Sequence, residues 1–179
     1  MGQVNADQVT LIETVNDART VQPPEYSNLA FATQTTLSVD DTAEIISVLQ
    51  FRFPDITGPR GEDICYATTN RQKAVKDIAG DVDLMLVIGA SNSSNSQRLV
   101  EVAKQAGAAD AVLIADKDAI AWEQTDKADH IGLSAGASAP ESLVQDVIQA
   151  LADRYDLTVT EHGHIRETVN FKLPSILTQ

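Results

Sequence analysis

The chain has 179 residues, a formal net charge of −13 and one cysteine, and 43% of its residues are hydrophobic. This size and hydrophobic content predict one or two folded domains, and a single cysteine excludes an internal disulfide framework. The acidic charge argues against nucleic acid or an anionic membrane as a partner. No apolar run of membrane-spanning length and no secretory leader is visible, so a cytoplasmic protein is expected.

Apolar runs alternate with amphipathic segments along the chain. In chain order they predict a strand at 29–33, a helix from 39, a helix around 74–78, a strand at 84–88, a helix around 99–106, strands at 111–114 and 130–133, and a helix around 144–151. Such alternation is typical of an α/β fold with mostly parallel sheets. We expect two small α/β units, a partial one at 1–60 and a second at 61–156, followed by C-terminal strands within 157–179.

Three loops that follow strands and precede helices are rich in hydroxyl side chains. Ser94 with Gln97 and Ser138 with Glu141 fit capping boxes, and Ser38 with Asp41 is a weaker version. In an open parallel sheet such loops lie at one edge, where helix N-termini attract anions. No Lys or Arg occurs in these loops. Two readings remain open, namely ordinary helix caps or a site for a phosphate or diphosphate built from neutral dipoles.

Cys65 lies near the expected start of the helix around 74–78. A thiol at a helix N-terminus is a good nucleophile or metal ligand, whereas a lone cysteine is more often a buried structural thiol. Spacing alone leaves both alternatives open. His162 and His164 form a weak candidate metal site without further spaced ligands, and we expect a solvated strand or turn there.

Four segments resemble signature motifs of the IspH/LytB family of 4-hydroxy-3-methylbut-2-enyl diphosphate reductases. They read TQTTLSVDDT at 33–42, DICYATTNRQ at 63–72, SSNS at 93–96 followed by Arg98-Leu99, and AGASAP at 135–140. The segments occur in the order and at about the spacing of that family. The resemblance is close from about Leu29 to Val147 and looser at both ends.

The resemblance implies a three-unit α/β fold, of which this chain would supply the last two units. It also implies reductive dehydroxylation of 4-hydroxy-3-methylbut-2-enyl diphosphate to isopentenyl and dimethylallyl diphosphate, with a ferredoxin- or flavodoxin-like electron donor. In the family, three cysteines hold a [4Fe–4S] cluster, and Cys65 matches the third of them. Thr36 matches a catalytic threonine beside the substrate hydroxyl. The residues that match the diphosphate-binding set are Ser93, Ser94, Asn95 and Ser138.

The resemblance also places several family residues before the segment that Met1 matches. These are the first two cluster cysteines, the substrate-binding histidines and a proton-delivering glutamate. One thiolate cannot hold a cubane cluster, which needs three or four protein ligands. We therefore expect an incomplete form of the reductase, and the alternative is a non-catalytic remnant that still binds diphosphate.

Overall fold

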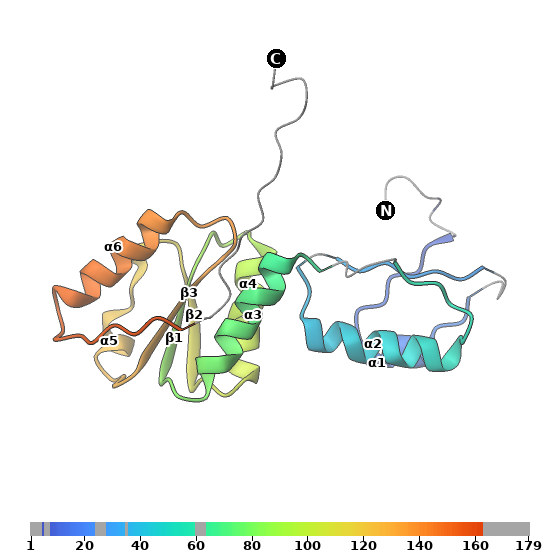
Figure 1. Ribbon diagram of the computed structural model, residues 1–179, viewed down its shortest axis with the longest axis horizontal. Coiled ribbons are helices and arrows are strands. Elements are labelled where there is room, and N and C mark those ends of the chain that lie inside the picture. The colour runs from blue at the N-terminus through green and yellow to red at the C-terminus, as the bar shows by residue number, and fades with distance from the viewer. Residues whose placement is uncertain (1–4, 6–7, 24–27, 35, 60–63, 163–179) are drawn as a thin grey trace, which may run out of the picture.

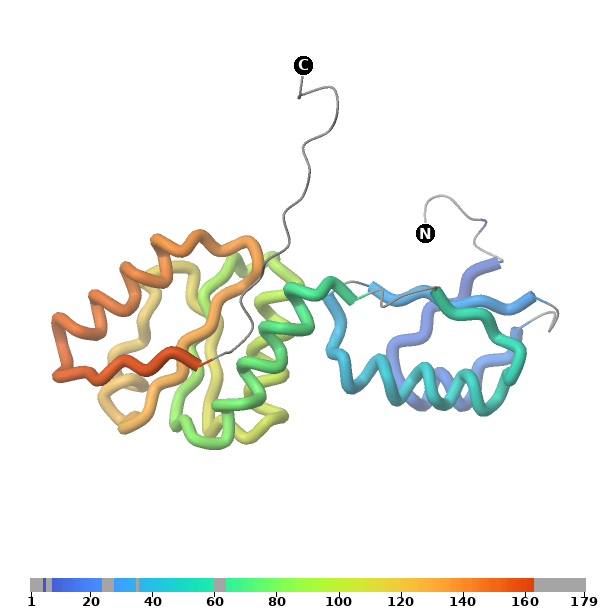
Figure 2. The backbone as a smooth tube through the Cα atoms, viewed as in Figure 1, coloured from blue at the N-terminus to red at the C-terminus, as the bar shows by residue number. Residues whose placement is uncertain are grey.

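The computed structural model describes residues 5, 8–23, 28–34, 36–59 and 64–162. Its elements are α1 (Val15–Thr20), α2 (Val39–Arg52), α3 (Tyr66–Ala79), β1 (Leu84–Ile88), α4 (Ser94–Gln105), β2 (Asp110–Ile114), the 3-10 helix η2 (Lys117–Ala119), α5 (Trp122–Thr125), β3 (Ile131–Ala135) and α6 (Glu141–Ala152). Figures 1 and 2 show two lobes, one holding α1 and α2 and the other holding the sheet with its helices. The predicted α/β class is confirmed.

A three-stranded parallel sheet forms the centre of the larger lobe. Its strand order is β2-β1-β3, and Leu84 at the start of β1 pairs with Asp110 on one side and Ile131 on the other. All five residues of β1 are buried, as the continuous apolar run at 84–88 predicts for a central strand. The expected strands at 111–114 and 130–133 are also present, with bounds shifted by one or two residues.

Helices cover both faces of this sheet. Successive β1 side chains point to opposite faces, so Met85 and Val87 pack against α3 and α4, whereas Leu86 and Ile88 pack against α6. Burying a side chain of this size contributes roughly 1.5–3 kcal/mol. The two cores hold the carboxyl ends of the strands at one fixed edge. Figure 1 shows α3 and α4 on one side of the sheet and α5 and α6 on the other.

The smaller lobe pairs α1 with α2. The Arg52 guanidinium at the end of α2 donates to the carbonyl oxygens of Ala18, at 2.5 Å, and Val21, at 2.7 Å. These two bonds satisfy carbonyls at the C-terminal end of α1, which the helix itself leaves unpaired.

The strand expected at 29–33 is wrong, because the structure has only one parallel bridge there, between Ala30 and Thr57. Phe31 N donates to the Thr57 carbonyl and Thr57 N donates to the Leu29 carbonyl, each at 2.9 Å. The next donor in a parallel ladder would be the backbone nitrogen of residue 59, which is Pro59 and carries no hydrogen. The ladder therefore ends after one bridge.

The C-terminal part of the expected organisation falls largely beyond the described residues. Leu157–His162 has no regular secondary structure, and residues 163–179 lie outside the described part. The boundary expected near residue 60 falls at 60–63, which is also outside it, so the division into units stays a prediction. Among the described residues, no helix is long and apolar enough to cross a membrane.

Candidate anion-binding site and cysteine

Two of the hydroxyl-rich loops lie side by side at the carboxyl edge of the sheet. Gly136 N, after β3, donates to the carbonyl of Ile88 at the end of β1, at 2.8 Å. The Ser96 side chain lies between the loops, because a Cβ atom added at Gly89 or at Gly136 would overlap its hydroxyl. The segments around Ser93 and Ser138 therefore leave neighbouring strands at adjacent points.

Ser93, rather than Ser94, is the N-cap of α4. Its hydroxyl accepts a hydrogen bond from Ser96 N at 3.3 Å. The capping box expected for Ser94 and Gln97 is therefore wrong by one residue, and Gln97 instead donates from its side chain to the Ser91 carbonyl at 2.6 Å. As a result Ser94 is the first helical residue, and its exposed hydroxyl takes no part in the cap.

The capping box expected for Ser138 and Glu141 is also wrong. Pro140 is the N-cap of α6, with φ −63° and ψ 142°, and no side chain caps this helix. The proline ring disfavours a helical conformation at Ala139, the residue before it, which excludes a helix that begins at Ala139 with Ser138 as its N-cap. Ser138 consequently stays in the loop with an exposed side chain, not engaged in capping.

Asn95 is a buried amide without a partner. Its side chain is 9% exposed, and neither Oδ1 nor Nδ2 has a hydrogen-bond partner among the described residues. A buried unsatisfied amide costs free energy, and most buried polar groups in proteins are paired. Asn95 lies in the first turn of α4, where the helix dipole favours negative charge. This position therefore suits a residue that pairs with a bound anion.

The loop that carries Thr36 is attached to α3. The buried side chain of Gln72 donates to the Leu37 carbonyl at 2.8 Å and accepts from Val39 N at 3.1 Å. Ser38 caps α2 as expected, since its hydroxyl accepts from Asp41 N at 3.3 Å. Thr36 is thus held two residues before a helix N-terminus and is partly buried.

Two ion pairs join the first turn of α2 to the neighbouring helices. Lys76 of α3 lies 2.5 Å from Asp40, and Arg98 of α4 lies 3.8 Å from Asp41. The N-terminal ends of α2 and α4 are therefore linked across the gap between the two lobes. This link attaches the start of α2, which follows the loop of Thr36, to the helix that begins at Ser94.

Cys65 occupies the N-cap position of α3, and its thiol is exposed. The structure thus excludes a buried structural thiol. Farther along α3, Arg71 Nε donates to the carbonyl of Ala135, the last residue of β3, at 3.1 Å. Cys65 lies six positions before Arg71, so its Cα lies about 9 Å from that of Arg71 along the helix axis, at 1.5 Å per residue. Figures 1 and 2 show the N-terminal ends of α3, α4 and α6 at the same edge of the sheet.

The described residues provide only part of the ligands that a metal cluster needs. Within the described ranges there is no group of three or more His, Cys, Asp and Glu side chains that could hold a metal ion. Cys65, exposed at a helix start, fits the role of a single thiolate ligand. His162 is exposed, and the rest of its expected motif lies outside the described residues.

Cations near the loops are already engaged. Arg98 lies 2.5 Å from Glu101 as well as near Asp41, and Arg71 donates to backbone carbonyls. An anion in these loops would therefore meet hydroxyls, an amide and helix dipoles, as expected from the sequence.

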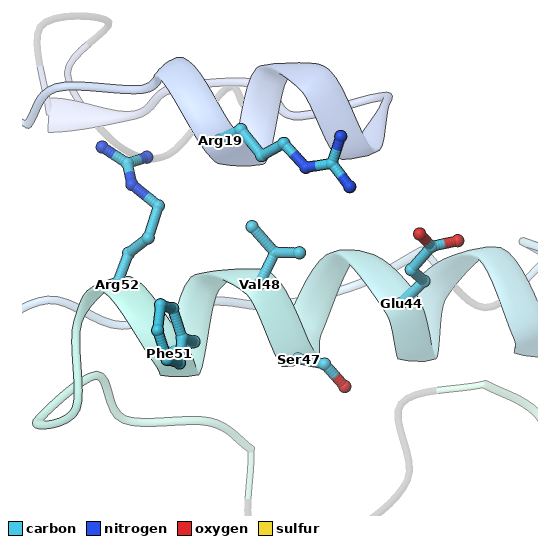
Figure 3. Close-up of a pocket in the computed structure, with 6 residues that line it drawn as sticks. All are labelled: Arg19, Glu44, Ser47, Val48, Phe51 and Arg52. Carbon is cyan, nitrogen blue, oxygen red and sulfur yellow. The ribbon is translucent and has the colours of Figure 1, made fainter.

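A separate shallow hollow lies between α1 and α2 (Figure 3). It is lined by Arg19, Glu44, Ser47, Val48, Phe51 and Arg52, none of which is a predicted site residue. The Phe51 ring at its rim is 88% exposed.

Two residues that shape the site were missed from the sequence. Ser96 is fully buried beneath the paired loops, and Gln72 bridges α3 and the Thr36 loop. A signal for Gln72 was present, because it lies in the buried stripe Thr68, Gln72, Val75 and Ala79 at helical spacing. A polar residue in such a stripe needs a hydrogen-bond partner.

Comparison with known proteins places these features in a family. The sequence model of the LytB protein family matches residues 1–152. The 4-hydroxy-3-methylbut-2-enyl diphosphate reductases of Hyphomonas neptunium and Gluconobacter oxydans are 60% and 55% identical over 99% of the chain, which covers 56% and 53% of their lengths. The chain thus spans about half the length of the curated relatives it matches.

A solved structure agrees with the sequence matches. The E-1-hydroxy-2-methyl-but-2-enyl-4-diphosphate reductase of Plasmodium falciparum superposes with a TM-score of 0.85 at 34% identity, over 93% of this chain and 53% of that one. The four quoted motifs, the arrangement of their loops and these matches agree, and the chain belongs to the LytB family.

Proposed function

We propose that this chain is the part of a 4-hydroxy-3-methylbut-2-enyl diphosphate reductase that binds the substrate diphosphate and supplies one ligand to the iron–sulfur cluster. The observation that carries the proposal is the buried Asn95 amide, whose two polar atoms lack partners among the described residues at the N-terminus of α4. A diphosphate oxygen would accept from Nδ2 and offset the cost of burying it.

The diphosphate would be held by neutral donors from the two adjacent loops. Ser93, Ser94 and Asn95 come from the start of α4, and Ser138 comes from the loop after β3. The N-terminus of a helix carries roughly +0.5 of an elementary charge, which adds to the hydrogen bonds of the side chains. Together they replace the lysines and arginines that these loops lack.

Thr36 and Cys65 would act at the other end of the substrate. The Thr36 hydroxyl would hydrogen bond to the substrate hydroxyl, and the Cys65 sulfur would hold one iron of a [4Fe–4S] cluster. Such a cluster, when bound, supplies a Lewis-acidic iron and electrons. The substrate takes up two electrons and two protons, its C–O bond breaks and the hydroxyl leaves as water, which gives isopentenyl and dimethylallyl diphosphate. A ferredoxin- or flavodoxin-like protein of the cytoplasm would supply the electrons.

The reductase is favoured over a non-catalytic diphosphate-binding remnant. Relatives that are 60% and 55% identical across 99% of this chain carry the reductase name. An exposed cysteine at the N-cap of α3 is useful to a cluster enzyme, whereas a remnant that only binds diphosphate does not need it.

The test joins this chain to the N-terminal half of the Hyphomonas neptunium relative, with the cluster reconstituted anaerobically from iron and sulfide. We expect conversion of 4-hydroxy-3-methylbut-2-enyl diphosphate to the two products. In Cys65→Ser, we expect loss of cluster absorbance and of turnover, because the cluster loses one of its thiolate ligands. A folded, cluster-loaded protein that does not convert the substrate would refute the proposal.

A further inference from the structure

Ser96 carries a buried hydroxyl that is closely packed on both sides. Ser96 is the third residue of α4, and its side chain is fully buried between the two loops of the site. Gly89 and Gly136 flank it so closely that neither could carry a Cβ atom without overlapping its hydroxyl. Close packing of this kind restricts the rotation of the Ser96 side chain. Its hydroxyl is therefore held in one direction.

That direction is toward Ser93. The Ser96 hydroxyl donates to Ser93 Oγ at 3.0 Å, and Ser96 N donates to the same oxygen at 3.3 Å. A serine hydroxyl has two acceptor sites and one proton to donate. Both acceptor sites of Ser93 are thus occupied, and only its proton remains for another partner.

The remaining proton of Ser93 has no acceptor among the side chains and carbonyls of the described residues. Ser93 is partly exposed at the start of α4, next to the buried Asn95 amide. Diphosphate oxygens are acceptors only, so a hydroxyl that can act only as a donor suits them. Water, in contrast, would pair with a hydroxyl of either orientation.

We propose that Ser96 is a positioning residue, whose wedged hydroxyl fixes Ser93 as a hydrogen-bond donor toward an anion held between the two loops. This inference rests on the proposed function, since it concerns the same diphosphate. In this role Ser96 does not touch the ligand and acts through Ser93 alone. Its effect should therefore disappear when the Ser93 hydroxyl is removed.

The experiment measures binding of inorganic pyrophosphate to the 179-residue chain by titration calorimetry at low salt. Ser96→Ala should weaken binding about three- to tenfold, the range for one ordinary hydrogen bond. Ser93→Ala should weaken it about tenfold or more, because it removes a bond to a charged group. The double variant should bind within about twofold of Ser93→Ala, since the two residues act as a unit.

Thr125→Val is the matched control. Thr125 is also a buried hydroxyl, 1% exposed, but it bonds to the Trp122 carbonyl in α5, away from the loops. The Thr125→Val substitution should lower the melting temperature of the chain without changing its affinity for pyrophosphate. If Ser96→Ala binds as the unaltered chain does, or if the losses of the two single variants multiply in the double variant, the role of Ser96 is overturned. If the unaltered chain does not bind pyrophosphate, the proposed pocket is overturned, and the role of Ser96 with it.

Discussion

The strongest structural prediction concerns Gln72, which connects the helix of Cys65 to the loop of Thr36. We consider Gln72→Leu, which keeps a side chain of similar size and removes both polar atoms. The variant leaves the Leu37 carbonyl and Val39 N without the partners that lie at 2.8 and 3.1 Å in the structure.

The expected loss of stability follows from these two unpaired backbone groups. An unsatisfied donor or acceptor costs about 1–3 kcal/mol when buried. Both bonds here are partly buried, so we take about 1.5 kcal/mol each and about 3 kcal/mol in total. For a chain of this size, 1 kcal/mol corresponds to a shift in melting temperature of about 2–4 °C. We expect a fall of about 6–12 °C.

The assay combines thermal unfolding with amide hydrogen exchange. If Gln72 holds the Thr36 loop to α3, exchange should rise first at 37–49, which covers the end of that loop and most of α2, while β1 stays protected. Gln149→Leu is the matched control, because Gln149 is an exposed glutamine of α6 whose side chain donates to the exposed carboxylate of Asp153. Its melting temperature should shift by less than about 2 °C, as is usual for surface substitutions.

A melting temperature for Gln72→Leu within about 2 °C of the unaltered chain would refute this reasoning. So would increased exchange that is spread evenly over the sheet rather than concentrated at 37–49, since it would indicate general destabilisation.

Two further predictions test the packing and the surface charges. Gly89→Ala should destabilise the chain by about 1–3 kcal/mol in urea unfolding, because its Cβ would overlap both Cβ and Oγ of Ser96. Gly80→Ala should be neutral or stabilising by up to about 1 kcal/mol, because its Cβ would meet the Ala106 carbonyl oxygen at 3.9 Å, an ordinary contact distance. Hydrogen bonds from Arg154 and then Tyr155 hold the pKa of Asp126 below its usual value. The stabilisation that the Asp126 carboxylate provides is therefore present at neutral pH and is lost as the pH falls below about 4. The difference in melting temperature between the unaltered chain and Asp126→Asn should shrink below that pH, and a difference that stays constant with pH would contradict the prediction.

The sequence predicted the sheet well because its signals are local. A continuous apolar run identifies β1 as a buried central strand, and a cysteine just before an amphipathic segment identifies the start of α3. The family motifs also indicated the loops in which we propose the site. These features depend on neighbouring residues along the chain, so spacing and composition are sufficient to find them.

The predictions were wrong where the structure is determined by residues far apart in the sequence or by the stereochemistry of proline. The bridge at Ala30 ends because Pro59, far along the chain, cannot donate the next hydrogen bond. The cap of α6 falls on Pro140 rather than Ser138 because of the restriction that proline imposes on the residue before it. Gln72 and Ser96 matter only through partners brought close by the fold, so no local pattern could assign their partners.

The charge distribution is consistent with the proposal that an anion is bound by neutral donors. The chain carries a net charge of −13, and the two arginines beside the loops are engaged, Arg98 with carboxylates and Arg71 with carbonyls. If this chain binds a diphosphate as we propose, its charge does not attract the ligand over long range, and the affinity would have to come from short contacts with oriented dipoles. Such contacts depend on geometry within a few tenths of an ångström. A fully buried side chain such as Ser96, which cannot rotate freely, is the kind of support that this recognition requires.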